Sequence, residues 1–420
     1  MKRFLLAAGL LLPPGPAGAE GPSAPPRPHF DHRTRALEFT DPARPLSPRD
    51  EPTEIVIAWF GPSDPTDAVG GDLWTAASIT VERANAAGGW NGRLFRLAPC
   101  WAGNPWSTGV ARLFKLVYEQ DVVAVLGSID GASTHLAEQV IAKAGVPLVS
   151  PVSTDASVNL AGVSWMFSCA PDDRAVARCL AEAALGEMTG QSTRPGTGIA
   201  LVNATDHDSR SLAKDLRQAL AERHSPVANH YEFTPGGNTF EAQLRALTAA
   251  DPTLLLLIAD AGDSARFLQA LQRAGSDAPV LGGPALGQRA FLQAVGPAAE
   301  GVRFPSLIDR SPPPPPAAET PASLNQESFD EHFLRVTGHA PDPQALLTRD
   351  ATRLLLEAIR LHGPERSAIR QALRDLSPWQ GRAGLIHFDG LGRNTRCPLD
   401  LLAIRDGKPT ATLPTLSPSP

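Results

Sequence analysis

The chain has 420 residues, of which 42% are hydrophobic, 20% charged and 6% aromatic, which is enough for two core-forming domains. Its 38 Lys and Arg residues against 44 Asp and Glu residues give a formal net charge of −6, and without a basic run this balance argues against a nucleic-acid partner. Proline, with 41 residues, is about twice as frequent as the usual share of roughly 5%.

The first nineteen residues have the pattern of a secretory signal peptide. Lys2 and Arg3 precede an apolar stretch at residues 4–12, and an Ala-x-Ala cleavage site ends at Ala19. No cysteine follows the apolar stretch, so we expect no lipid anchor. No later stretch is long and apolar enough for a membrane span. The sequence therefore predicts a soluble protein exported to the periplasm.

Residues 20–52 are rich in Pro, Arg and Asp without periodicity, so we expect a disordered lead. Residues 411–420 are expected to form a disordered tail. A proline run at 312–316 marks a surface excursion within residues 311–323.

We predict that a chain beginning at Glu51 keeps the thermal midpoint of the full mature chain within about 3 °C, because an unpacked lead contributes well under about 1 kcal/mol to a large domain. Calorimetry on both chains tests this, and a larger loss would mean that the lead packs on the folded part.

Apolar strands alternate with amphipathic helices from residue 54 onward. This pattern is typical of a parallel sheet covered on both faces. The expected strands of the first series are 54–59, 94–98, 122–126 and 147–150, and its expected helices are 72–87, 108–119 and 134–144, with Phe114 facing inward.

A second α/β series follows a predicted boundary at residues 167–171. Its expected helices are 174–186, 211–223, 240–249 and 264–274, and its expected strands are 198–203, 229–233, 253–259 and 280–281. Two helices, 349–360 and 365–376, and two strands, 385–389 and 399–404, complete the chain.

Motifs of catalysis and metal binding are absent from the sequence. It contains no G-x-S-x-G, H-E-x-x-H, phosphate-binding or dinucleotide-binding motif. Its ten histidines are scattered, the pairs His224/His230 and His332/His339 lack helical ligand spacing, and the four cysteines form no C-x-x-C pair. We therefore predict no enzyme activity, no cofactor and no metal ligands. Export permits disulfides among Cys100, Cys169, Cys179 and Cys397, but buried thiols are an equally good interpretation.

Two loops after predicted strands, 127–134 and 150–155, are candidate solute-binding segments. Ligands of open α/β sheets lie beyond the carboxyl ends of the strands. Both loops precede helices, so free N–H groups and the hydroxyls of Ser133, Ser153 and Thr154 could bind a carboxylate. The alternative is helix capping, by Asp130 or Ser133 in the first loop and by Asp155 in the second.

Two segments, GPSDPTDAVGGDLWTAASITVERANAAGGWNGR and VVAVLGSIDGASTHLAEQVIAKAGVPLVSPVSTDASV, closely resemble the periplasmic branched-chain amino-acid binding proteins, the type I solute receptors of ATP-driven (ABC) importers. IHFDGLGRN is similar to a late hinge segment of that family. The resemblance implies two Rossmann-like lobes with parallel sheets, joined by three crossovers and closing on a ligand. It implies lobe 1 at 53–167 plus 304–388, and lobe 2 at 168–303 plus 389–410.

The family's ligand contacts match this chain in part. Thr154 matches the threonine that holds the ligand's carboxylate and amine, and Val152 matches a backbone contact. The family's carboxylate-binding serine is Gly131 here, with Ser133 as a nearby substitute. Asp208 replaces a tyrosine. The ammonium-binding acid expected near residues 283–285 is missing, and Asp260 is the nearest alternative.

Two further features complete the candidate site. Trp74 is the aromatic residue expected to cover a ligand, unless it packs on the lobe 1 sheet. Asp130, Asp208 and Asp260 together would favour an amine or polyol, although each alone is commonly a solvated or capping carboxylate. We expect the Thr154 hydroxyl to serve the ligand and to matter little for folding.

The expected function is that of an exported solute-binding protein of an ABC importer, with a small polar solute such as an amino acid and membrane permease subunits as partners. A ligand sensor that docks to a signalling protein is the first alternative. An exported hydrolase is the second, and a Ser/His/Asp cluster between the lobes would support it.

Overall fold

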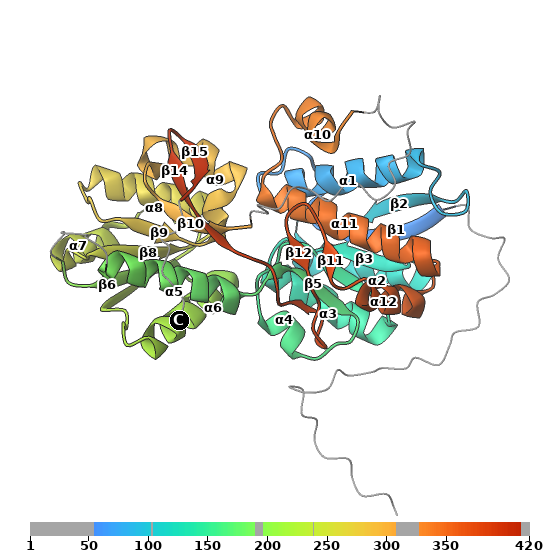
Figure 1. The fold of residues 1–420 in the computed structure, drawn as a ribbon, viewed down its shortest axis with the longest axis horizontal. Helices are drawn as coiled ribbons and strands as arrows, with labels where there is room; N and C mark the ends of the chain where they lie inside the picture. Colours follow the sequence, from blue (N-terminus) through green and yellow to red (C-terminus); the bar gives the residue numbers. More distant parts are fainter. Residues whose placement is uncertain (1–53, 102–103, 190–195, 238, 308–326, 413–420) are drawn as a thin grey trace, which may run out of the picture.

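The computed structural model describes residues 54–101, 104–189, 196–237, 239–307 and 327–412. The predicted signal peptide, the lead, the proline run and all but the first two residues of the predicted tail lie outside the described residues. Figure 1 shows two α/β lobes side by side, each built around its own sheet.

The sheet of lobe 1 has six strands in the order β13-β5-β4-β3-β1-β2. All of its pairings are parallel, as expected for strands that are apolar along their length. Its strands are β1 (Glu54–Phe60), β2 (Leu94–Pro99), β3 (Ala124–Gly127), β4 (Leu148–Ser150), β5 (Met166–Pro171) and β13 (Arg393–Asn394).

Helices cover both faces of this sheet. The helices α1 (Gly71–Ala86), α11 (Pro343–His362) and α12 (Arg366–Asp375) bury apolar side chains in one core cluster with the sheet. The helices α2 (Val110–Glu119) and α3 (Gly131–Ala144) share the opposite core. Three smaller elements complete lobe 1, namely α4 (Ser157–Leu160), α10 (Phe329–Thr337) and the hairpin of β11 (Trp379–Gln380) with β12 (Leu385–Ile386).

The sheet of lobe 2 has seven strands in the order β15-β14-β10-β9-β8-β6-β7. Its strands are β6 (Ile199–Ala204), β7 (Asn229–Phe233), β8 (Leu254–Ile258), β9 (Val280–Gly282), β10 (Arg303–Ser306), β14 (Asp400–Arg405) and β15 (Lys408–Ala411). The strand β8 is buried at every residue, which explains its unbroken apolar sequence. The last two strands pair antiparallel, so the prediction of parallel strands fails at this edge.

Helices also cover both faces of the second sheet. The helices α5 (Asp173–Thr189) and α6 (His207–Glu222) form one core with it, and α7 (Glu241–Ala250), α8 (Ala261–Arg273) and α9 (Arg289–Val295) form the other. The chain passes between the two sheets three times, after β5, after β10 and after β13 (Figure 1). These passages confirm the three predicted crossovers.

Several local predictions were wrong. The strand β5 lies wholly in the first sheet and β10 wholly in the second, while β13 returns to the first, so the strands run past the predicted boundaries at 167/168, 303/304 and 388/389. The strand β15 reaches Ala411, one residue into the predicted tail. Phe114 is 53% exposed because the buried face of α2 consists of Leu113, Leu116 and Val117.

Candidate functional site

Loops from both lobes meet at what we call the inter-lobe junction, defined by Gly131, Thr154, Asp155, Asp173, His207 and Asp208. Gly131 and Asp155 follow β3 and β4 of lobe 1, whereas Asp208 lies in the first turn of α6, directly after β6 of lobe 2. The Gly131 N–H donates a hydrogen bond of 2.9 Å to Asp208 Oδ1 across the lobes. The carboxyl ends of the parallel strands in the two sheets therefore face a common region, as expected for ligand sites of this architecture.

The loop after β3 places a glycine against the opposite lobe. A Cβ atom at Gly131 would lie 2.3 Å from Asp208 Oδ1 and 2.5 Å from the Asp155 Cβ, so only glycine allows this close approach. Asp130 caps α3 by accepting a hydrogen bond from the Ser133 N–H at 2.6 Å, and the Ser133 hydroxyl also donates to Asp130. Of the two capping candidates that the sequence left open, Asp130 is the cap of α3, and Ser133 is the residue that donates to it.

Thr154 forms a hydrogen bond with Asp173, a site residue that the sequence analysis did not identify. Its hydroxyl donates to Asp173 Oδ1 at 2.7 Å, and the Asp173 N–H donates to the Thr154 carbonyl at 2.6 Å. Asp173 begins α5, and its side chain is buried. Burial raises the pKa of Asp173 to about 8. Its position at the start of a helix, directly after a buried strand at the lobe boundary, was the signal that could have identified it.

Three buried oxygen atoms at or beside the junction have no hydrogen-bond partner among the described residues. They are Ser150 Oγ, Ser153 Oγ and Asp173 Oδ2. An unsatisfied buried polar group is costly, so these atoms are candidates for contact with a bound solute. Val152, in the same loop, packs its side chain into the core of lobe 1.

The three predicted aspartates have different surroundings in the structure. Burial and the charge of Asp130 raise the pKa of Asp208 to about 7. Asp260 caps α8 by accepting the Asp263 N–H at 2.6 Å. Burial also raises the pKa of Asp260, and the charges acting on it include those of Asp263 and Asp206. The charge of Asp130 thus acts on Asp208, whereas Asp260 caps a helix.

Trp74 has the packing role that the sequence offered as its alternative. It lies on α1, partly buried against the core of lobe 1, and its ring centroid is 5.8 Å from that of Trp59. Asp72, also on α1, forms an ion pair with Arg289 of α9 at 2.8 Å. This ion pair is a second contact between the lobes.

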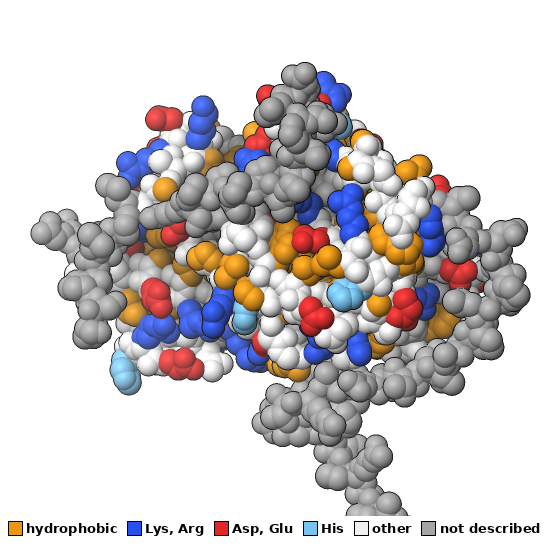
Figure 2. Space-filling model, turned by 45° about the vertical axis from the view of Figure 1, so that its right-hand side comes forward, with side chains coloured by type: hydrophobic (Ala, Val, Ile, Leu, Met, Phe, Trp, Pro, Cys, Tyr) orange, Lys and Arg blue, Asp and Glu red, His pale blue; other side chains and the backbone are white. Residues whose placement is uncertain are grey.

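The cysteines, the surface charges and the helix lengths bear on three further predictions from the sequence. All four cysteines are unpaired, and Cys100 and Cys169 are buried, which favours the thiol interpretation over disulfides. Lys and Arg side chains are interspersed with Asp and Glu on the face shown in Figure 2. Among the described residues, no helix is both long and apolar enough to cross a membrane.

A hollow of about 450 Å³ lies on lobe 1 between β2 and α2, where Arg96, Arg112 and Lys115 contribute to its lining. None of its lining residues belongs to the inter-lobe junction. Two of the three cations have acidic neighbours, since Arg96 pairs with Glu54 at 2.7 Å and Lys115 lies 3.9 Å from Glu119.

The sequence pattern of the periplasmic binding protein family matches residues 54–408. A Leu/Ile/Val-binding protein homologue from Brucella melitensis is 22% identical over 84% of this chain and 92% of its own length. An amino acid binding protein from Pseudomonas aeruginosa is 34% identical over 47% of this chain, and the match spans about half, 51%, of that relative.

Solved structures share the fold. The branched-chain amino acid transporter substrate-binding protein LivJ from Streptococcus pneumoniae, solved with isoleucine, superposes with a TM-score of 0.71 at 20% identity, covering 85% of this chain and 98% of its own. A leucine-binding protein, LivK, from Thermotoga maritima gives a TM-score of 0.72 at 19% identity, with coverage of 86% and 98%. These findings confirm the resemblance and the fold class drawn from the sequence.

Proposed function

The chain belongs to the periplasmic binding protein family, and on that premise we propose that it is the exported solute-binding subunit of an ABC importer. In this proposal the two lobes close on an amino acid or a related small polar solute. The protein performs no covalent chemistry. The membrane permease subunits then recognise the closed form, because closure gives the bound protein a distinct shape.

The observation that carries the proposal is the contribution of both lobes to one set of polar groups. Lobe 1 supplies the Gly131 N–H and the hydroxyls of Ser153 and Thr154, and lobe 2 supplies Asp173 and Asp208. Such a set matches a zwitterion, because N–H and O–H groups bind a carboxylate and carboxylates bind an ammonium group.

The solute would exchange hydrogen bonds with the junction. Asp208 now accepts the Gly131 N–H. A solute carboxylate would replace Asp208 at that donor. The displaced Asp208 and the neighbouring Asp173, whose pKa values are raised in the solute-free protein, would ionise on receiving the solute ammonium, because a nearby cation favours the charged carboxylate. Charge-assisted hydrogen bonds of this kind contribute roughly 1.5–3 kcal/mol each.

Native mass spectrometry of the purified protein tests the proposal. We expect a mass excess of one small solute per chain that disappears on denaturation. Calorimetry with the amino acids and their amides should then identify a ligand that binds with one-to-one stoichiometry. A protein that purifies empty and binds none of these compounds would contradict the proposal.

The sensor alternative differs only in the partner. Neighbouring genes for permease and ATPase subunits, and solute uptake by vesicles that contain those subunits and this protein, would favour import. Solute binding without such uptake, together with solute-dependent capture of a signalling receptor, would favour the sensor.

One contact set favours the hydrolase alternative in part. His135 Nε2 lies 2.8 Å from Ser157 Oγ, and its Nδ1 lies 3.2 Å from Glu138, which resembles a nucleophile, a base and an orienting acid. However, hydrogen bonds to Asp155 and Glu138 raise the pKa of His135 to about 9. An imidazole that is protonated at neutral pH cannot accept the serine proton, and a panel of chromogenic esters should therefore show no turnover.

A further inference from the structure

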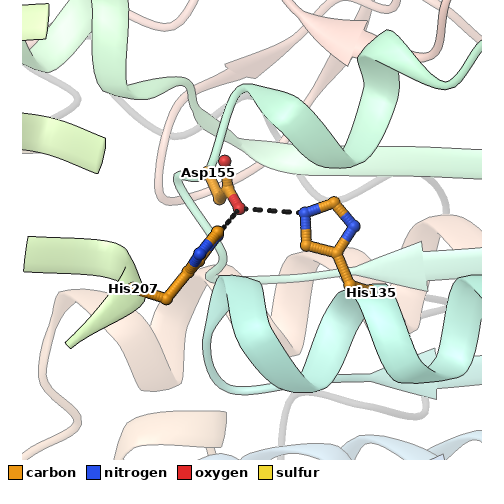
Figure 3. A group of neighbouring side chains, drawn as sticks. All are labelled: His135, Asp155 and His207. Atoms are coloured by element: carbon orange, nitrogen blue, oxygen red, sulfur yellow. Dashed lines mark hydrogen bonds and ion pairs between the residues drawn. The ribbon is translucent and has the colours of Figure 1, made fainter. Parts of the chain in front are cut away.

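Two histidines from opposite lobes converge on one carboxylate at the inter-lobe junction (Figure 3). His207 Nε2 lies 2.6 Å and His135 Nε2 lies 3.2 Å from the same oxygen, Asp155 Oδ2. His135 is on α3, Asp155 follows β4, and His207 is the first residue of α6. One ligand atom from each of the three side chains lies within 4.8 Å of the others.

We propose that His135, Asp155 and His207 form a binding site for a divalent transition-metal ion of the zinc type, with ligands from both lobes. Imidazole nitrogen and carboxylate oxygen are donors that zinc prefers in proteins. This site shares no residue with the solute contacts proposed above, although Asp155 adjoins Thr154 and His207 adjoins Asp208 in the chain. It does not depend on the identity of the solute.

The spacing of the donors suits a small tetrahedral ion. With metal–ligand bonds of about 2.0–2.2 Å, the donors of a tetrahedral site lie roughly 3.3–3.6 Å apart. The two distances to Asp155, 2.6 and 3.2 Å, and the 4.8 Å limit on the whole group bracket this spacing. Small side-chain shifts would therefore be enough to admit the ion between the three donors.

A second carboxylate orients one of the imidazoles. The Nδ1 atom of His135 contacts Glu138 Oε2 at 3.2 Å, which directs Nε2 toward Asp155. Metal-bound histidines commonly donate their other ring N–H to a carboxylate in this way, which fixes the tautomer and the ring orientation. A bound ion would replace the proton on the Nε2 atom of His135, since a ligating imidazole nitrogen carries no proton. Glu138 is buried, and its Oε1 has no hydrogen-bond partner within the described part of the chain.

The three side chains differ in their exposure to solvent, with Asp155 buried and His207 exposed. The Asp155 side chain is 0% exposed, whereas the His207 side chain is 49% exposed. An ion can therefore approach from solvent on the His207 side. Three protein ligands leave a fourth position for water or for a donor group of another molecule.

Because its ligands come from both lobes, the site would link ion binding to the closure of the lobes. His135 and Asp155 belong to lobe 1 and His207 belongs to lobe 2. A bound ion would therefore hold the lobes together, and its affinity would be linked to their closure.

Zinc titration of the metal-stripped, solute-free protein tests the proposal. The protein must carry no polyhistidine tag, because a tag would itself bind zinc. We expect one zinc per chain by calorimetry and elemental analysis, and no binding of Mg²⁺ or Ca²⁺ at the same concentrations. Glu138→Gln should weaken zinc binding by about 10- to 100-fold, as expected for loss of a partner that orients a ligand.

Substitutions on the two lobes separate a shared site from a local one. His135→Ala and His207→Ala should each weaken zinc binding more than Glu138→Gln does, whereas His362→Gln, at an exposed histidine that ends α11, should leave it unchanged. Circular dichroism verifies the fold of each variant. Absence of saturable zinc binding would overturn the proposal, as would unchanged affinity in either His135→Ala or His207→Ala.

Small-angle scattering adds a readout of conformation. We expect zinc to make the solute-free protein more compact, and His207→Ala to abolish that change. Zinc binding without any difference in compaction between the wild type and His207→Ala would overturn the role of the ion in holding the lobes together. Because no solute is present in these measurements, failure of the solute-binding proposal would not affect their outcome.

Discussion

Replacement of Thr154 by valine is expected to weaken binding of the native solute by about 10- to 150-fold. The substitution keeps the shape of the side chain and removes a hydroxyl at the inter-lobe junction. Loss of a hydrogen bond to a charged solute oxygen costs roughly 1.5–3 kcal/mol, which corresponds to that range of affinity. Calorimetry with the solute identified by mass spectrometry measures the change.

Thr154→Ser and Thr80→Val are the matched controls. The serine variant keeps the hydroxyl and should stay within a few-fold of the wild type. Thr80→Val removes a buried hydroxyl that donates to Ala76 within α1, away from the junction, and should leave affinity unchanged. Wild-type affinity in Thr154→Val would exclude this hydroxyl from the solute site.

The structure changes one expectation about the same variant. The sequence predicts that the hydroxyl of Thr154 is dispensable for folding, but this hydroxyl donates to the buried Asp173 at 2.7 Å. Thr154→Val would leave Asp173 Oδ1 without that donor, so we expect a loss of stability of about 1–3 kcal/mol as well. Thr154→Ser should avoid this loss.

For Asp173→Asn, we expect the free energy of unfolding of the solute-free variant, minus that of the wild type, to increase as pH rises. Burial raises the pKa of Asp173 to about 8 in the folded protein, against about 3.9 in an unfolded chain. The folded protein therefore binds this proton more tightly than the unfolded chain. Its stabilising contribution is complete below about pH 4 and is lost as pH rises toward about 8.

The expected size of this effect is about 1.4 kcal/mol per pH unit within that window. Between pH 5 and pH 7, the free energy of unfolding of the variant minus that of the wild type should grow by about 2–3 kcal/mol. Urea denaturation at both pH values measures it, with Asp375→Asn at an exposed position as the control. A difference that does not change with pH would show that Asp173 ionises as an ordinary surface carboxyl does.

The alternation of strands and helices, and the family, could be predicted from the sequence alone. Strands that are buried on both faces must be apolar at every position, as in β8, and helices that cover a sheet must be apolar on one face. These are local requirements, so they are visible in short windows of sequence. The sequence also indicates Gly131 as a candidate site residue, whereas its contact with Asp208 of the opposite lobe depends on the fold.

Which polar groups meet depends on the packing of the two lobes. The pairs Thr154–Asp173, Gly131–Asp208 and Asp155–His207 join residues that are 19, 77 and 52 positions apart, and no local pattern encodes such a distance. For the same reason, the spacing of histidines along the chain indicated no metal ligands, although two of them converge on one carboxylate. Side-chain orientation and lobe packing set these contacts, and both are properties of the folded chain as a whole.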